Sequence, residues 1–166
     1  MQRRELFGSL TSAFRDNDSK TEEETIIVRP PYNNDETLFH KECHNCDARC
    51  AAVCEEEIIK IAQDKTPYLS FEKSGCTFCD DCVGACEFGV LTLEKKKDID
   101  LLVNISVSSC ISWDGTMCFS CKDPCLENAI VFQGLFKPVI DENKCTACGF
   151  CISRCPTSAI EIGAIA

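Results

Sequence analysis

The chain of 166 residues has no long uninterrupted run of apolar residues. Because a membrane-spanning helix needs roughly 18 consecutive apolar residues, we expect no membrane span. Basic residues are also few relative to acidic ones: 17 Lys and Arg accompany 27 Asp and Glu, for a formal net charge of −10 at pH 7. Nucleic-acid binding depends on basic patches that contact phosphates, so this charge balance argues against a nucleic-acid partner.

Histidine is scarce as well, with only His40 and His44 in the chain. Since histidine is the most frequent general acid or base in enzymes, little is left for catalysis of that kind. The sequence shows no nucleophile–base pair and no substrate-binding loop. The acidic run of Glu55, Glu56 and Glu57 is interpreted as a solvated helix face, and we expect the protein not to be an enzyme.

Cysteine, in contrast, is abundant, with 16 residues in the chain. Such an excess fits a disulfide scaffold in an oxidising compartment or a set of metal ligands in a reducing one. The cellular compartment therefore decides how these cysteines are interpreted.

The N-terminal sequence MQRRELFGSL bears on the compartment, because the pair Arg3 and Arg4 is a feature of twin-arginine export signals. Such a signal also needs an apolar segment of about 7–15 residues and a small-residue cleavage site. Here the apolar residues recur at helical spacing, never more than two in a row, and a charged stretch follows. We therefore predict a cytoplasmic protein with an amphipathic arm and flexible linker over residues 1–25. Arg3 and Arg4 would then bind a partner protein, or the arm would simply pack on its own domain.

The cysteines form four groups of four with related spacing. The groups are Cys43, Cys46, Cys50 and Cys54; Cys76, Cys79, Cys82 and Cys86; Cys110, Cys118, Cys121 and Cys125; and Cys145, Cys148, Cys151 and Cys155. The residues after each last cysteine repeat too, as CEEEIIKI, CEFGVLTL, CLENAIVF and CPTSAIEI. An internal repeat of this kind indicates a repeated supersecondary unit, here a strand, a cysteine loop, a short helical turn and a second strand.

The spacing C-x2-C-x2-C places three thiolates on one tight loop, where they can hold three corners of an iron–sulfur cube. The fourth cysteine is expected to begin a short helix, and in two-cluster ferredoxins it ligates the neighbouring cluster. Zinc sites usually use two separated C-x2-C knuckles, and disulfides do not require one repeated spacing. We therefore predict four 4Fe–4S clusters with all sixteen cysteines as ligands. Groups one and three have longer intervals, so the spacing argument applies less directly to them.

These motifs predict an α+β fold with two tandem bacterial-type ferredoxin-like modules, over residues 26–95 and 96–166. The predicted cores are thin, so metal ligation should supply much of the folding free energy. Residues such as Asp47, Asp80 and Gly149 should adopt left-handed conformations where the loops reverse. Pairing of group one with group two, or with group four, is compatible with the spacing. The core residues predicted are Ile26, Val28, Leu69, Phe71, Leu91 and Leu93 in the first module and Val103, Ile105, Ile130, Phe132, Val139, Ile140, Ile160 and Ile162 in the second.

Beside the cysteine motifs, the chain has further distinctive features: Arg3 and Arg4, the stretch Arg29-Pro30-Pro31-Tyr32, Glu36, Phe39, and the long interval from Cys110 to Cys118. With these features the chain resembles the NapF-type ferredoxins, accessory iron–sulfur proteins of the periplasmic nitrate reductase system. The resemblance implies that all sixteen cysteines are cluster ligands and that the protein binds the catalytic subunit of the reductase in the cytoplasm, before export. It also implies assistance in maturation, by donation of a cluster or of electrons. A plain electron carrier and an electron-transfer subunit of a membrane oxidoreductase remain the alternatives.

Overall fold

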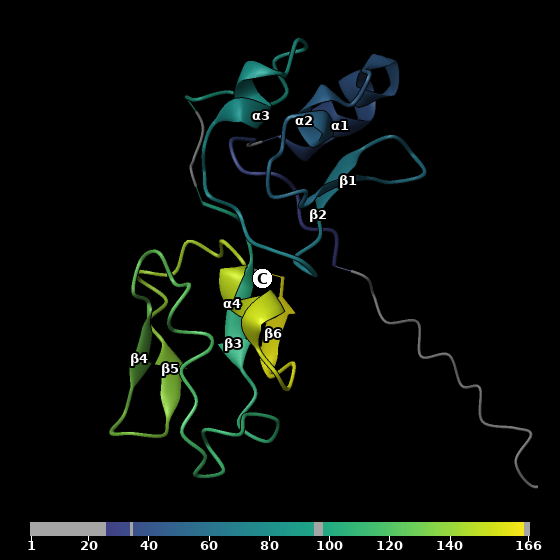
Figure 1. Cartoon of the computed structure of the whole chain (residues 1–166). Coiled ribbons are helices and arrows are strands. Elements are labelled where there is room, and N and C mark those ends of the chain that lie inside the picture. Colours follow the sequence, from purple (N-terminus) through teal and green to yellow (C-terminus); the bar gives the residue numbers. More distant parts are fainter. Residues whose placement is uncertain (1–25, 34, 95–97, 165–166) are drawn as a thin grey trace, which may run out of the picture.

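The computed structural model describes residues 26–33, 35–94 and 98–164 (Figure 1). The predicted arm and linker over residues 1–25, which include Arg3 and Arg4, lie outside the described residues. The charged residues 95–97 between the two predicted modules lie outside them as well. Within the described ranges, none of the helices has the length and apolar character needed to cross a membrane.

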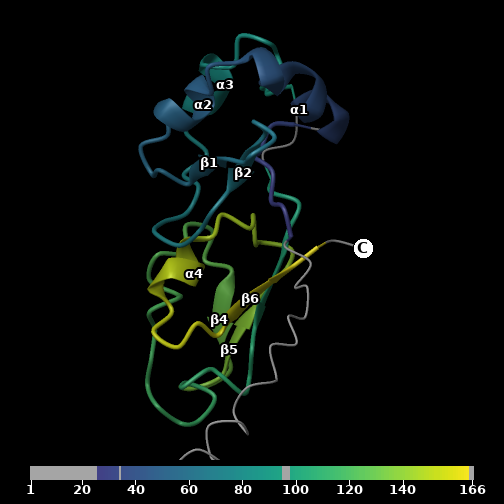
Figure 2. The same cartoon turned by 90° about the vertical axis from the view of Figure 1, so that its right-hand side faces the viewer.

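Short helices and short strands alternate along the chain, as the α+β prediction requires. The first half contains α1 (Glu36–Glu42), the 3-10 helix η1 (Cys43–Asn45), α2 (Arg49–Ala52), β1 (Ile59–Ile61), β2 (Pro67–Leu69) and α3 (Asp81–Gly84). The second half contains β3 (Leu102–Ile105), β4 (Ile130–Phe132), β5 (Pro138–Ile140), α4 (Phe150–Arg154) and β6 (Ile160–Gly163). Figures 1 and 2 show the two halves stacked end to end.

The strands pair as antiparallel ribbons. β1 pairs with β2 in the first half, and in the second half β4 pairs with β5 while β3 pairs with β6. In the second half the first and last strands are thus paired with each other, with Val103 opposite Ile162. Three of the four repeated tails, those after Cys54, Cys125 and Cys155, form strands as the repeat predicts.

The tail after Cys86 does not form a strand, so that part of the repeat prediction was wrong. Its backbone groups have other partners. The Leu91 N–H donates to the Cys86 sulfur at 3.4 Å, and the Val90 carbonyl accepts from the Asn33 side chain at 2.6 Å. The Thr92 N–H donates to the Tyr32 carbonyl at 3.0 Å, and the Val28 carbonyl accepts from the Leu69 N–H of β2 at 2.7 Å.

The position of the short helices also differs from the prediction. α2, α3 and α4 each contain the third cysteine of a group and end before the fourth, so the fourth cysteine does not begin a helix. Each helix is entered through a left-handed residue: Ala48 before α2, Asp80 before α3 and Gly149 before α4. The prediction was correct for Asp80 and Gly149 but wrong for Asp47, because the extra residue in group one moves the reversal to the next position.

The backbone after each fourth cysteine follows one pattern in all four groups. The residue three positions on has a positive φ and donates its N–H to the carbonyl of that cysteine. The four residues are Glu57, Gly89, Asn128 and Ser158. The repeat read from the sequence is therefore a repeat of backbone conformation as well.

The buried apolar residues form one continuous cluster that includes residues of both halves, rather than two separate cores. It includes Val28 and Phe71 from the first half and Val103 from the second. Ile26, Leu93 and Ile162 were predicted to be core residues, but they are 41%, 65% and 39% exposed. These positions lie near the ends of the described segments, where no element covers them fully.

Candidate iron–sulfur sites

The fold gathers the sixteen cysteines into four sets of four, each lining its own pocket. Every set takes three cysteines from one group and one from the neighbouring group in the sequence. The sets are site I, with Cys43, Cys46, Cys50 and Cys86; site II, with Cys54, Cys76, Cys79 and Cys82; site III, with Cys110, Cys118, Cys121 and Cys155; and site IV, with Cys125, Cys145, Cys148 and Cys151. Group one thus exchanges its fourth cysteine with group two, and group three with group four. This is the sequential pairing that the sequence left open.

None of the sixteen cysteines forms a disulfide bond. The members of each set surround a pocket instead of converging on a point. Among the residues that the structure describes, no three Cys, His, Asp or Glu side chains gather tightly enough to hold a single metal ion.

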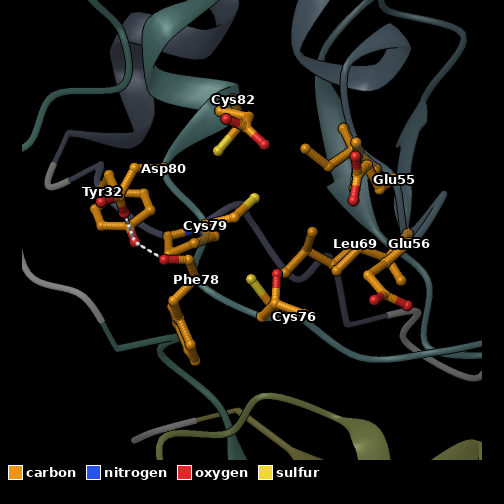
Figure 3. Close-up of a pocket in the computed structure, with 15 residues that line it drawn as sticks. Tyr32, Glu55, Glu56, Leu69, Cys76, Phe78, Cys79, Asp80 and Cys82 are labelled. Atoms are coloured by element: carbon orange, nitrogen blue, oxygen red, sulfur yellow. Dashed lines mark hydrogen bonds between the residues drawn. The ribbon is translucent and has the colours of Figure 1, made fainter.

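Site II lies between the loop of group two and the start of β1. Figure 3 shows Cys76, Cys79 and Cys82 along one side of the pocket, with Leu69 and Glu55 across from them. Cys79 is the only one of the sixteen cysteines that is exposed; the others are buried or partly buried.

The loop of site II is held from outside by Tyr32, which is 3% exposed. Its hydroxyl donates to the Phe78 carbonyl at 3.2 Å and also to the Asp80 carboxylate. Burial raises the pKa of Tyr32, and the Asp80 carboxylate raises it further, so the phenol remains a donor at neutral pH. Tyr32 therefore fixes the turn that separates Cys79 from Cys82.

Site I is supported by Arg29, whose side chain is 13% exposed. The guanidinium donates to the Thr66 hydroxyl and the Pro67 carbonyl, both at 2.9 Å, and lies 5.0 Å from the centre of the Phe39 ring. It also forms an ion pair with Glu36 at 3.3 Å. These contacts join β2 to α1, which leads directly into Cys43. The stretch with Arg29 and Tyr32, noted in the sequence with Glu36 and Phe39, thus supports two sites.

Site III contains the long interval between Cys110 and Cys118. Trp113, in this interval, donates its indole N–H to the Pro138 carbonyl at 3.1 Å, and Ser112 donates to the Phe136 carbonyl at 3.3 Å. The Lys137 ammonium lies 5.5 Å from the centre of the Trp113 ring. The inserted residues are therefore anchored on β5 beside the site. Sequence reasoning did not single out Trp113, although its place as the only Trp in the chain, inside an irregular cysteine interval, was an available signal.

Backbone N–H groups face the thiols. Cys86, Cys125 and Cys155 accept hydrogen bonds on sulfur from the N–H groups of Leu91, Ala129 and Ala159, at 3.4, 3.3 and 3.2 Å. A left-handed residue followed by a right-handed helix, as at the starts of α2, α3 and α4, forms a concavity of N–H groups that suits anions. Thiolates and the sulfides of an anionic cluster are acceptors of this kind, so the sites fit the predicted group.

Burial changes the acidity of these thiols. Burial, together with the charges of neighbouring cysteines, raises the pKa of Cys82 and of Cys151 to about 12. Burial also acts on Cys155, but the backbone N–H groups of Thr157 and Ala159 donate to its sulfur and lower its pKa. Metal binding at Cys82 and Cys151 must therefore displace the protons that these raised pKa values retain.

The fold and the four cysteine sets define the class: this is a ferredoxin-type protein that binds 4Fe–4S clusters. When bound, such a cluster supplies one-electron oxidation and reduction. The model of the 4Fe–4S binding domain family matches residues 138–161, which span β5, the loop of group four, α4 and the start of β6.

Curated relatives give the narrower assignment. The ferredoxin-type protein NapF of Escherichia coli K12 is 32% identical over 80% of this chain and 82% of its own length. NapF of Haemophilus influenzae is 29% identical over 82% of this chain and 79% of its own. The methylamine utilization ferredoxin-type protein MauM of Methylophilus methylotrophus is 29% identical over 87% of this chain and 73% of its own length. The chain belongs to the NapF family of ferredoxin-type proteins.

Proposed function

We propose that the protein carries four 4Fe–4S clusters, one at each of sites I to IV. The observation that supports this is the partition of all sixteen cysteines into four sets around four pockets. Cysteines are exchanged between groups one and two and between groups three and four, but not between groups two and three. We therefore also propose two tandem ferredoxin-like modules, over residues 26–95 and 96–166. Sites I and II belong to the first module, and sites III and IV to the second.

We further propose that the protein is a cytoplasmic, non-enzymatic accessory factor of the periplasmic nitrate reductase. It would bind the catalytic subunit before export and assist its maturation by donating a cluster or electrons. Membership in the NapF family supports this system as the setting. The exposed thiol of Cys79 supports donation, because site II is the site with a ligand that an acceptor protein can reach directly.

The second candidate is a ferredoxin-like electron carrier, including a role beside a membrane electron-transfer subunit. The observation that favours it is the close contact between the loops of groups two and four, described below. The two candidates differ in how firmly the clusters are held. Iron that passes to an apo-acceptor within minutes supports donation, whereas iron that stays bound through repeated oxidation and reduction supports the carrier.

The N-terminal arm gives a test of partner binding that leaves the sites untouched. We expect the double variant Arg3→Ala, Arg4→Ala to retain less of the reductase catalytic subunit from anaerobic cytoplasm, with iron per chain unchanged. The reason is that the sequence of the arm is cationic and amphipathic on an otherwise acidic chain, so it suits an acidic partner surface. Its binding to such a surface should weaken as the salt concentration rises. Deletion of residues 1–15 should reduce capture at least as much.

A matched control keeps this comparison specific. Lys60→Ala with Lys73→Ala removes the same charge from the body of the protein, at β1 and after β2, where Lys73 forms an exposed ion pair with Glu57. It should leave capture at the wild-type level. Equal capture by wild type and by the truncated protein would remove the docking role of Arg3 and Arg4.

A further inference from the structure

The two halves meet through the cysteine loops themselves. The Cys76 N–H donates to the Cys148 carbonyl at 2.6 Å, so a residue of site II is hydrogen-bonded directly to a residue of site IV. A second backbone bond runs nearby, from the Ile99 N–H to the Thr146 carbonyl at 3.4 Å, just after Cys145. Figures 1 and 2 both show the chain after β2 approaching α4 at the boundary between the halves.

Two glycines make this approach possible. A Cβ on Gly75 would overlap the Phe150 backbone nitrogen and would lie 2.6 Å from the Cys148 carbonyl oxygen. A Cβ on Gly149 would overlap the ring of Phe71, and Gly149 also has a φ of 86°. Both positions therefore require a residue without a side chain. The closeness of the two loops is set by the residues that flank Cys76 and Cys148, on both sides of the contact.

The order of the sites follows from this contact and from the exchanged cysteines. Sites I and II share α2 and α3, which pack against each other, and they exchange Cys54 and Cys86. Sites III and IV exchange Cys125 and Cys155 in the same way. The Cys76–Cys148 bond then joins site II to site IV.

We propose that the Cys76–Cys148 contact, with Gly75 and Gly149, is an electronic junction that orders the four sites in one line, I–II–IV–III. The order differs from that of the cysteine groups in the sequence, since the loops of groups two and four lie in the middle. Sites I and III are then the two ends of this line, and site II, with the exposed Cys79, lies inside it. Exchange of one electron across the junction oxidises one site and reduces the other, makes or breaks no bond and moves no proton. This inference rests on the proposed loading of all four sites.

The test compares Gly75→Ala with a matched glycine variant in the same cysteine group. Gly84 lies in α3, and a Cβ there would meet nothing within 4 Å, so Gly84→Ala is the control. Each protein is loaded anaerobically, its iron is measured, and it is reduced with dithionite. Paramagnetic resonance then reports the magnetic interaction between sites, and hydrogen exchange of the peptide that contains Cys76 reports whether the contact is closed.

In the wild type and in Gly84→Ala we expect a spectrum in which the two halves interact. In Gly75→Ala we expect this interaction to be lost, leaving the spectra of two independent pairs, with faster exchange at Cys76 and unchanged iron. If Gly75→Ala loads poorly, Phe71→Leu loosens the same contact without adding an atom, and it should weaken the interaction in the same direction. An unchanged spectrum in a variant whose Cys76 amide exchanges faster would overturn the junction. Iron well below about sixteen per chain in the wild type would instead contradict the four-site loading.

Discussion

Removal of iron and sulfide from the anaerobic protein is expected to unfold the whole chain, not only the cysteine loops. In the part of the chain that the structure describes, the longest helix, α1, has 7 residues, and the strands have 3 or 4. Helices and hairpins of this length are not stable alone in water. For scale, structural zinc in zinc-finger peptides contributes roughly 10–16 kcal/mol of apparent binding free energy, whereas whole domains are stable by only about 5–15 kcal/mol. The free energy lost with the clusters is therefore larger than the stability that the remaining contacts can supply.

The cysteines are also part of the core, which strengthens this expectation. Cys121 is buried within the apolar cluster, and most of the other cysteines pack against this cluster. Loss of the clusters empties two pockets in each half, so the apolar residues that pack around the cysteines lose packing partners. Circular dichroism and hydrogen exchange should both report the loss, and anaerobic reconstitution with iron and sulfide should reverse it. A metal-free chain that still melts cooperatively near the temperature of the loaded protein would contradict this expectation.

The second large effect concerns the exchanged ligands. Cys43 and Cys86 belong to different cysteine groups but line the same pocket, site I, and we compare the variants Cys43→Ala and Cys86→Ala. Each should remove about four of roughly sixteen irons, and both should remove the same spectroscopic component. Because one site cannot be emptied twice, the double variant should lose no more iron than either single variant. Strong non-additivity of this kind is the signature of residues that act on one site.

Cys155→Ala provides the matched control, since Cys155 is also a fourth cysteine but lines site III. Combined with Cys43→Ala, it should give additive losses, about eight irons in total. Additive losses for Cys43→Ala with Cys86→Ala would instead place these two cysteines in different sites. That result would contradict the sequential exchange between groups one and two.

The cysteine spacing predicted more of this protein than any other feature did. It indicated the cofactor and the repeat. Of the four strands predicted to follow a last cysteine, three are present and the one after Cys86 is not. It did not indicate that the tail with Leu91 stays irregular, because that depends on side chains such as Asn33 from a distant segment. It also placed the left-handed turn of group one at Asp47 and not at Ala48. One inserted residue shifts a loop conformation without leaving a sign in the spacing.

The supporting contacts were less visible still. The sequence singled out Arg29 and Tyr32 as family features but gave no reason for them. The structure supplies one, since Arg29 joins β2 to the helix before Cys43 and Tyr32 holds the turn at Asp80. The approach of Gly75 to Cys148 joins segments far apart in the chain, and no local pattern predicts it. The location in the cell, the partner and the role of the arm stay predictions from the sequence and the family.

The most direct measurement of the central claim is the content of iron and acid-labile sulfide per chain in anaerobically reconstituted protein. Four 4Fe–4S clusters at sites I to IV predict about sixteen of each, with the paramagnetic resonance of reduced 4Fe–4S clusters. A value near twelve would mean that one of the four sites does not hold a cluster, with site I or site III the first to examine because of their irregular spacing. Zinc in place of iron, or fewer than about eight irons per chain after reconstitution, would contradict the account.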